Sequence, residues 1–266
     1  MGERVFVTGA GVIVPERPPE RMTIEREVFA ACVDSPDPDG RLPARRKRRM
    51  NRVGIMAAAA ALRALDDAGI DADDCRDFGI CVGTGLGCTQ SMDDFFTQIV
   101  TADPALASPA IFPNGIPNAI ASQVALLLRL GGPNATLSAR EISGEIAIAT
   151  AADWVRSGRA SRVLAGGADE LTANLVNYAA ALGLGGPLAE GAAFLVLEGE
   201  KARSRAKAEV AEVRHFEAET GVFHGWLAAG AARAAAAVGG VVAEGTVTVE
   251  GRSSGGPAVC LTFVRP

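Results

Sequence analysis

The stretch from Leu130 to Thr150, LGGPNATLSAREISGEIAIAT, decides the fold. It predicts a turn, a short strand over Ala135–Ala139, a sharp corner, and then a helix that begins at Ser143-Gly144. Several classes of α/β enzyme place a nucleophile at such a strand-to-helix corner. The N-terminus of the following helix favours negative charge, through its dipole and its unpaired N–H groups. The residue at the corner of this chain is Glu141.

The composition limits the kind of core and the kind of partner. The chain has 266 residues, of which 48% are hydrophobic and only 5% aromatic. A core of this size must therefore be built mainly from Ala, Val, Leu and Ile, and alanine-rich helices can pack closely. The formal net charge of −5 argues against general nucleic-acid binding and is compatible with an ordinary soluble enzyme.

The cysteines and the apolar runs indicate the compartment. The five cysteines form no CxxC pair and no metal-ligand spacing, and their number is odd. We therefore expect reduced, buried thiols in a cytoplasmic protein, with no bound metal. No signal peptide precedes the first strand, and no run of about 18 apolar residues would cross a membrane. The cysteines are Cys32, Cys75, Cys81, Cys88 and Cys260.

The opening of the chain admits a cofactor interpretation. A strand is predicted over Arg4–Thr8, and Gly9-Ala10-Gly11 follows it, as in the start of a dinucleotide-binding unit. The third glycine of that motif is missing, and Pro15 opposes a helix. A short-chain oxidoreductase would also need a YxxxK pair, whereas Leu182 lies four residues after the only tyrosine, Tyr178. We expect no cofactor, although the oxidoreductase remains a remote alternative.

Alternating helices and strands favour an α/β layered fold with a mostly parallel sheet flanked by helices. Apolar spacing and helix-stop residues define these elements. Helices are expected near Ile24–Cys32 and over Met50–Ala68, Thr89–Val100, Ala119–Leu130 and Ser143–Ser157, and strands over Phe78–Val82 and Arg162–Leu164.

Four motifs resemble those of the β-ketoacyl synthases, which have the thiolase fold. They are the loop Gly83–Gly87, the loop Ser108–Asn118, the nucleophile segment Gly132–Gly144 and the string Ala165–Glu170. In these enzymes the nucleophile segment carries a cysteine, which falls on Glu141 here.

The C-terminal part resembles a shortened second half of these enzymes. The resemblance implies residues 1–205 as an N-terminal half, with residues 206–266 as the remnant of a C-terminal half packed into the same domain. The first catalytic histidine of the family has no counterpart between Phe216 and Gly221, and His224 fits the position of the second. The thiolase-like layered fold would then have a strongly truncated second half.

The resemblance implies a subunit that does not catalyse condensation. Without the cysteine and one histidine, the chain is similar to a chain length factor, which pairs with a catalytic ketosynthase and helps to shape the acyl tunnel. The alternative is a malonyl-carrier decarboxylase, because family members with glutamine at the cysteine position retain decarboxylation. The missing first histidine counts against that activity. Glu141 and His224 could also have purely structural roles, as a cap or ion-pair partner and as a helix-start residue.

The same resemblance implies three groups of site residues. The expected partners are a catalytic ketosynthase and an acyl carrier protein. The alternative is that the helix Thr89–Val100 is ordinary core and that the basic run Arg45–Arg49 is a solvated face. The expected tunnel residues are Met92, Phe95, Phe96, Ile99 and Phe112. The expected dimer-interface residues are Ala110, Ile111, Phe112, Ile116, Asn118, Thr136, Leu137 and Ser138. The expected carrier-docking residues are Arg45, Arg46, Lys47, Arg48 and Arg49.

Overall fold

The computed structural model describes residues 3–21, 28–101, 109, 111–182, 188–217, 234–238, 245–252 and 257–266. Within these residues, one sheet has eight strands and a small sheet has three. The order across the large sheet is β10 (Thr246–Arg252), β11 (Pro257–Val264), β9 (Ala208–Glu217), β1 (Phe6–Ile13), β8 (Gly191–Glu198), β6 (Arg162–Asp169), β4 (Phe78–Gly83) and β5 (Asn134–Leu137). The small sheet is β2 (Glu20–Arg21), β3 (Phe29–Ala31) and β7 (Leu188–Ala189).

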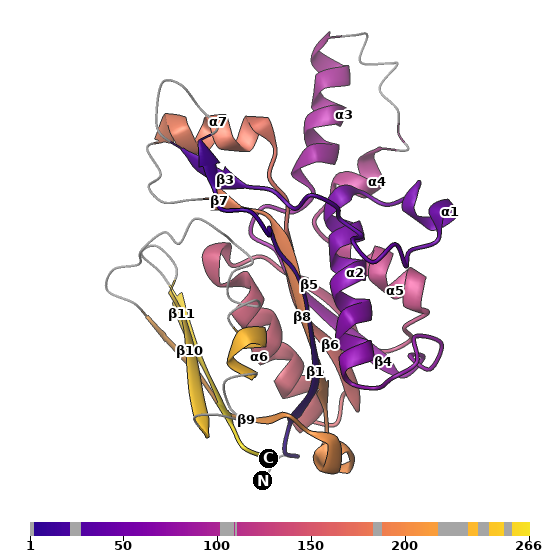
Figure 1. Cartoon of the computed structure of the whole chain (residues 1–266), viewed down its shortest axis with the longest axis vertical. Coiled ribbons are helices and arrows are strands. Elements are labelled where there is room, and N and C mark those ends of the chain that lie inside the picture. The colour runs from indigo at the N-terminus through magenta and orange to yellow at the C-terminus, as the bar shows by residue number, and fades with distance from the viewer. Residues whose placement is uncertain are drawn as a thin grey trace.

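The helices cover both faces of the large sheet, so the predicted α/β layered architecture is confirmed (Figure 1). The helical segments are α1 (Ala44–Lys47), α2 (Arg52–Asp67), α3 (Thr89–Thr101), α4 (Phe112–Gly115), α5 (Ala119–Leu128), η2 (Arg140–Ile142), α6 (Ser143–Arg156), α7 (Ala173–Leu182) and η3 (Glu200–Arg205). One core lies between the sheet and the pair α2 and α5, and the other lies between the sheet and α6. No helix in the described residues combines the length and the apolarity that a bilayer crossing requires.

Most strands of the large sheet share one direction. In its described part, β5, β4, β6, β1 and β11 run one way and β8, β9 and β10 run the other. Parallel pairing joins β5 to β4 and β4 to β6, whereas the remaining neighbours are antiparallel. The nucleophile-type corner follows β5 in the parallel part, where helices connect the strands.

The glycines of the opening motif lie inside β1 and serve packing. A Cβ at Gly11 would lie 2.2 Å from the carbonyl oxygen of Ala60, and a Cβ at Gly9 would lie 2.2 Å from that of Ala64. Both carbonyls belong to α2, which therefore packs closely onto the strand. The expected strand over Arg4–Thr8 was too short, and the glycines do not form the turn that a dinucleotide would need.

Helix α6 is buried between two parts of the sheet. Ten of its fourteen residues are buried, including Ile148 and Trp154. Its core also includes Val249, Leu261 and Phe263 from β10 and β11, so the C-terminal strands cover the side of α6 that faces away from β4 and β6 (Figure 1).

Three further expectations need correction. A helix was expected near Ile24–Cys32, but Phe29–Ala31 form the strand β3, whose Ala30 packs against α7. Residues 22–27 lie outside the described part. The strand Arg162–Leu164 continues to Asp169, because Gly166 permits close approach to β8: a Cβ there would lie 1.9 Å from the Ala193 carbonyl oxygen. Cys32 is exposed, whereas the other four cysteines are buried, and all five are free.

Candidate functional site

The corner between β5 and α6 is held by one hydroxyl. The Oγ atom of Ser143 accepts a hydrogen bond from the Ala139 amide at 2.9 Å and donates one to the Arg140 carbonyl at 2.6 Å. Arg140 has a φ of 54°, in the left-handed region that non-glycine residues seldom adopt. Such backbone strain is common at functional corners, and here a buried serine maintains it.

Glu141 lies within this corner, as the sequence predicts. It is 7% exposed and occupies the centre of η2, immediately before the buried Ile142. The end of β4 is pressed against the same place, because a Cβ at Gly83 would lie 2.0 Å from the Ser143 carbonyl oxygen. The corner therefore carries a buried carboxylic acid, which is a poor acceptor of acyl groups from a thioester.

The described cysteines near the core do not provide a substitute thiolate. Burial raises the pKa of the Cys75 thiol to about 11 and that of the Cys81 and Cys88 thiols to about 12. Burial also raises the pKa of Cys32. The thiolate is the reactive form, so these raised pKa values disfavour the four thiols as nucleophiles at neutral pH.

Asp169, a buried acid at the end of β6, lies against the loop that follows β4. Its Oδ1 atom accepts hydrogen bonds from the Thr84 hydroxyl at 2.7 Å, the Gly85 amide at 3.0 Å and the Leu86 amide at 3.1 Å. Burial raises the pKa of Asp169 to about 6, although these donors oppose the shift. The glycine-rich loop thus binds a carboxylate of its own chain, which explains its shape without a phosphate ligand.

A second buried acid, Glu170, lies beside it. Its Oε1 atom accepts a hydrogen bond from the Gln90 amide at 3.0 Å, and its Oε2 atom accepts one from the Val53 amide at 3.1 Å. Burial raises the pKa of Glu170 to about 7. Neither acid was predicted to have a role. The available signal was a pair of acids at the end of an apolar strand, where an unpaired carboxylate would be costly.

The expected tunnel residues lie together on α3 and α4, but they do not form a buried core. The rings of Phe95 and Phe112 lie 5.7 Å apart between centroids, and Met92 lies against Gly115. Phe96 is 54% exposed, Ile99 is half-buried, and no residue of α3 is buried. A closed apolar tunnel would therefore need a further wall beyond the described part of this chain.

The expected interface residues lie in two places, around α4 and on β5. Ile111 and Ile116 are half-buried and Asn118 is exposed around α4, while Thr136 and Leu137 are half-buried on β5. Phe112 and Ser138 are exposed. Ala110 and His224 lie outside the described residues.

The basic run lies on and after α1. Lys47 forms an ion pair with the buried Asp37, at 2.9 Å between Nζ and Oδ2, so its charge is used within the chain. The four arginines Arg45, Arg46, Arg48 and Arg49 are exposed. A carrier-docking role is therefore open to the arginines and less suited to Lys47.

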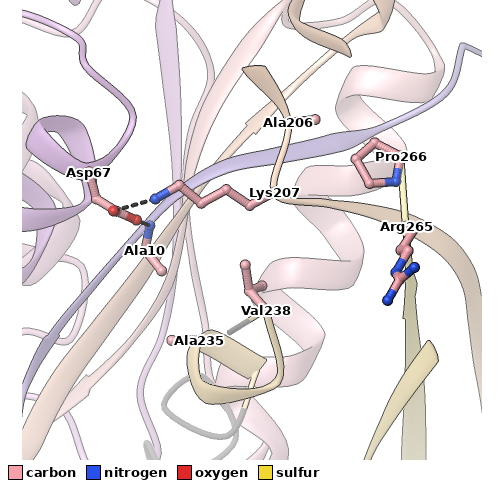
Figure 2. Close-up of a pocket in the computed structure, with 8 residues that line it drawn as sticks. All are labelled: Ala10, Asp67, Ala206, Lys207, Ala235, Val238, Arg265 and Pro266. Carbon is pink, nitrogen blue, oxygen red and sulfur yellow. Dashed lines mark hydrogen bonds and ion pairs between the residues drawn. The ribbon is translucent and has the colours of Figure 1, made fainter. Parts of the chain in front are cut away.

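A cavity of about 940 Å³ lies elsewhere in the chain (Figure 2). Its walls come from β1, the end of α2, the start of β9 and the end of the chain, and they share no residue with the corner. Figure 2 shows Lys207 and the Ala10 amide both directed at the Asp67 carboxylate, which they bind. Among the described residues, no group of three His, Cys, Asp or Glu side chains could hold a metal ion.

Comparison with known proteins places the corner in a family. Residues 16–203 match the model of the beta-ketoacyl synthase N-terminal domain. The chain belongs to the beta-ketoacyl synthase family. Nodulation protein E of Rhizobium leguminosarum bv. trifolii is 31% identical over 194 residues, covering 66% of this chain and 48% of the relative. The putative beta-ketoacyl synthase 1 for oxytetracycline polyketide from Streptomyces rimosus is 31% identical over 195 residues, covering 62% and 45%. The chain thus spans about half the length of these relatives.

Solved structures support the thiolase-like ketosynthase fold. One similar structure is a type II PKS acyl-carrier protein in complex with its ketosynthase, with a TM-score of 0.85 at 18% identity and full coverage of both chains. Another is the ishigamide ketosynthase/chain length factor, with a TM-score of 0.82 at 19% identity and full coverage of both chains. Likeness at this level of identity concerns the fold alone.

Proposed function

We propose that this chain is a non-catalytic ketosynthase-like subunit, similar to a chain length factor. It would pair with an active β-ketoacyl synthase in polyketide or fatty-acid-type biosynthesis and help to shape the tunnel for the growing acyl chain. The observation that carries the proposal is Glu141, buried at the corner where the family resemblance expects the nucleophilic cysteine. Decarboxylative condensation needs a thiolate at that point, and a carboxylate would give an anhydride that hydrolyses.

The free edge of β5 supports a pairing role. The Ile80 amide donates to the Pro133 carbonyl at 2.8 Å, and the Thr84 amide donates to the Leu137 carbonyl at 3.0 Å. Backbone groups alternate in direction along a strand, so those of Asn134 and Thr136 point away from β4. β5 ends the sheet in the described part of the chain. Such an edge offers unpaired donors and acceptors to a strand of another chain.

An exposed apolar surface on α3 and α4 also supports a partner that covers it. Phe96, Val100 and Phe112 are 54%, 80% and 48% exposed on α3 and α4. Exposed large apolar residues that gather in one place often mark an interaction surface. An acyl chain also gains about 0.8 kcal/mol per buried methylene, which favours a tunnel with apolar walls on both sides. One similar structure contains an acyl-carrier protein in complex with its ketosynthase. Another is a ketosynthase/chain length factor. Both fit the partners proposed for this chain.

Reconstitution with a catalytic ketosynthase tests the proposal. The purified chain, incubated with malonyl-carrier and an acyl primer, should give no condensed product, and addition of the partner should start or alter elongation. Glu141→Cys alone should remain inactive, because the other catalytic donors are incomplete. A condensed product from the chain alone would overturn the proposal. Release of CO₂ without condensation would instead favour the malonyl-carrier decarboxylase.

A further inference from the structure

Helix α3 is supported unevenly along its length. None of its residues is buried, and Val100 near its C-terminal end is 80% exposed. In the described part of the chain, α3 contacts α4, where Phe95 meets Phe112 and Met92 meets Gly115. Figure 1 shows α3 extending away from the sheet. Hydrophobic packing against the main core therefore does not fix the direction of this helix.

The base of α3 is held by polar contacts to the end of β6. The Glu170 carboxylate, 1% exposed, accepts the amide of Gln90 in the first turn of α3 and the amide of Val53 in the first turn of α2. Helix N-termini leave amides without partners inside the helix, and they favour negative charge. One carboxylate thus accepts a hydrogen bond from one amide in the first turn of each helix, and so joins the two helix starts.

Glu170 is itself held in place by its neighbours. The Glu190 carboxylate is fully buried, forms an ion pair with Arg52, and accepts a hydrogen bond from the Leu171 amide at 3.2 Å. On the other side, Asp169 holds the loop that leads into α3. The main chain at Glu170 is therefore fixed on both sides before its side chain contacts the helices.

We propose that Glu170 is a positioning residue for α3, which sets the direction of this helix relative to α2 by accepting a hydrogen bond from the first turn of each. Asp169 and Glu190 hold Glu170 in the required place. The direction of α3 decides where Met92 and Phe96 lie. Only this last consequence, for the acyl tunnel, rests on the proposed function.

Amide hydrogen exchange of the purified chain tests this role without a partner or a product. In Glu170→Gln the side chain keeps a single acceptor oxygen, and its NH₂ group faces a backbone donor. Because α2 is held by many buried side chains, α3 should open first. We expect amides in the first turn of α3 to exchange at least tenfold faster, with β8 and α6 unchanged. Asp94→Asn is the matched control, since the exposed Asp94 carboxylate accepts from the Gln90 side chain and not, in the described residues, from a buried amide. Amide exchange in this variant should stay within twofold of wild type.

The pH profile of the same exchange distinguishes positioning from general stability. The groups that face Glu170 are Asp169, Glu190, Arg52 and Cys88. Burial raises the pKa of Glu170 to about 7, and opening of the α3 base would hydrate it. Opening therefore releases a proton and becomes easier as the pH rises towards 7. After correction for intrinsic exchange, opening of the α3 base in wild type should increase as the pH rises from about 6 to about 7. In Glu170→Gln this increase should be lost. Any pH dependence of opening below about pH 6 should remain, because it comes from Asp169.

Three results would overturn the proposal. The first is α3 exchange in Glu170→Gln that matches wild type. The second is equal acceleration in α3, β8 and α6, which would mean general destabilisation. The third is a flat wild-type profile between pH 6 and pH 7, which can be measured even if the variant does not fold. None of these results depends on a ketosynthase partner, so failure of the proposed function would be recognised separately.

Discussion

The hydroxyl of Ser143 joins the Ala139 amide across the corner that carries Glu141, at 2.9 Å. It also donates to the Arg140 carbonyl, so one side chain closes both ends of a strained turn. The side chain of Ser143 thus closes the corner in which Glu141 is buried.

Removing that hydroxyl should loosen the corner. In Ser143→Ala the Ala139 amide loses its partner, and an unsatisfied group of this kind costs about 1–3 kcal/mol. Urea unfolding should show a loss in that range. Ser157→Ala is the control, because the Ser157 hydroxyl is at the exposed end of α6 and its loss should cost less than about 0.5 kcal/mol. Equal effects in both variants would contradict the role of Ser143.

Gly11→Ala should destabilise the chain strongly. The new Cβ would lie 2.2 Å from the backbone oxygen of Ala60, which cannot move without shifting α2. We expect a loss of about 3 kcal/mol or more, or failure to fold. Gly40→Ala is the control: its φ of 64° is strained for alanine, but no atom lies within 4 Å, so the loss should be about 1–2 kcal/mol. Thermal melts of the two variants make the comparison.

Asp169 should make stability depend on pH. Its pKa is raised from 3.8 to about 6, so the folded chain keeps a proton that the unfolded chain has lost. Stability from this group is full below about pH 4 and falls as the pH rises to about 6, by up to about 3 kcal/mol. Asp169→Asn retains the main acceptor oxygen and should lack this fall. Urea midpoints from pH 4.5 to 8 check it, and a wild type that gains stability over Asp169→Asn in that window would contradict it.

Thr136→Pro should prevent assembly with a ketosynthase while leaving the fold intact. The lost amide points away from β4, so the internal ladder keeps its bonds and the outer edge loses a donor. Thr136→Val keeps the amide and should assemble normally. Size-exclusion chromatography with light scattering, on mixtures with the partner, measures both. Unchanged assembly of Thr136→Pro would exclude this edge as the interface.

Met92→Ala should shift the products of the reconstituted pair towards longer chains. Met92 lies against Gly115, so its truncation would lengthen the proposed acyl tunnel by roughly a few methylene groups. Leu126→Ala is the control, because Leu126 lies on α5 and is 70% exposed, and the products should stay unchanged. Product chain lengths by mass spectrometry decide the matter. If Met92→Ala assembles normally and the distribution does not move, α3 does not set the length.

The sequence predicted the parts of the fold that depend on local patterns. Apolar spacing identified α2, α3 and α6 closely, and the corner with Glu141 lies where the strand and helix signals meet. The prediction from sequence failed where tertiary contacts determine the local structure. The glycines of β1 look like a loop in sequence, but they are strand residues because α2 packs on them. The hydrogen bonds of Glu170 join residues 117 and 80 positions apart, which no local pattern encodes.

The position of β1 in the sheet has a consequence for synthesis. Its Gly9 pairs with Val196, and its start pairs with β9 beyond residue 207. At about 5–20 residues per second, the ribosome needs roughly 10–40 s to supply these partners after it has made β1. During that time the apolar residues Val5, Phe6 and Val7, which the finished sheet buries, remain without their neighbouring strands. Such long-range pairing slows folding. The central sheet can thus close only after residue 209 has been made, and these apolar residues lack their neighbouring strands until then.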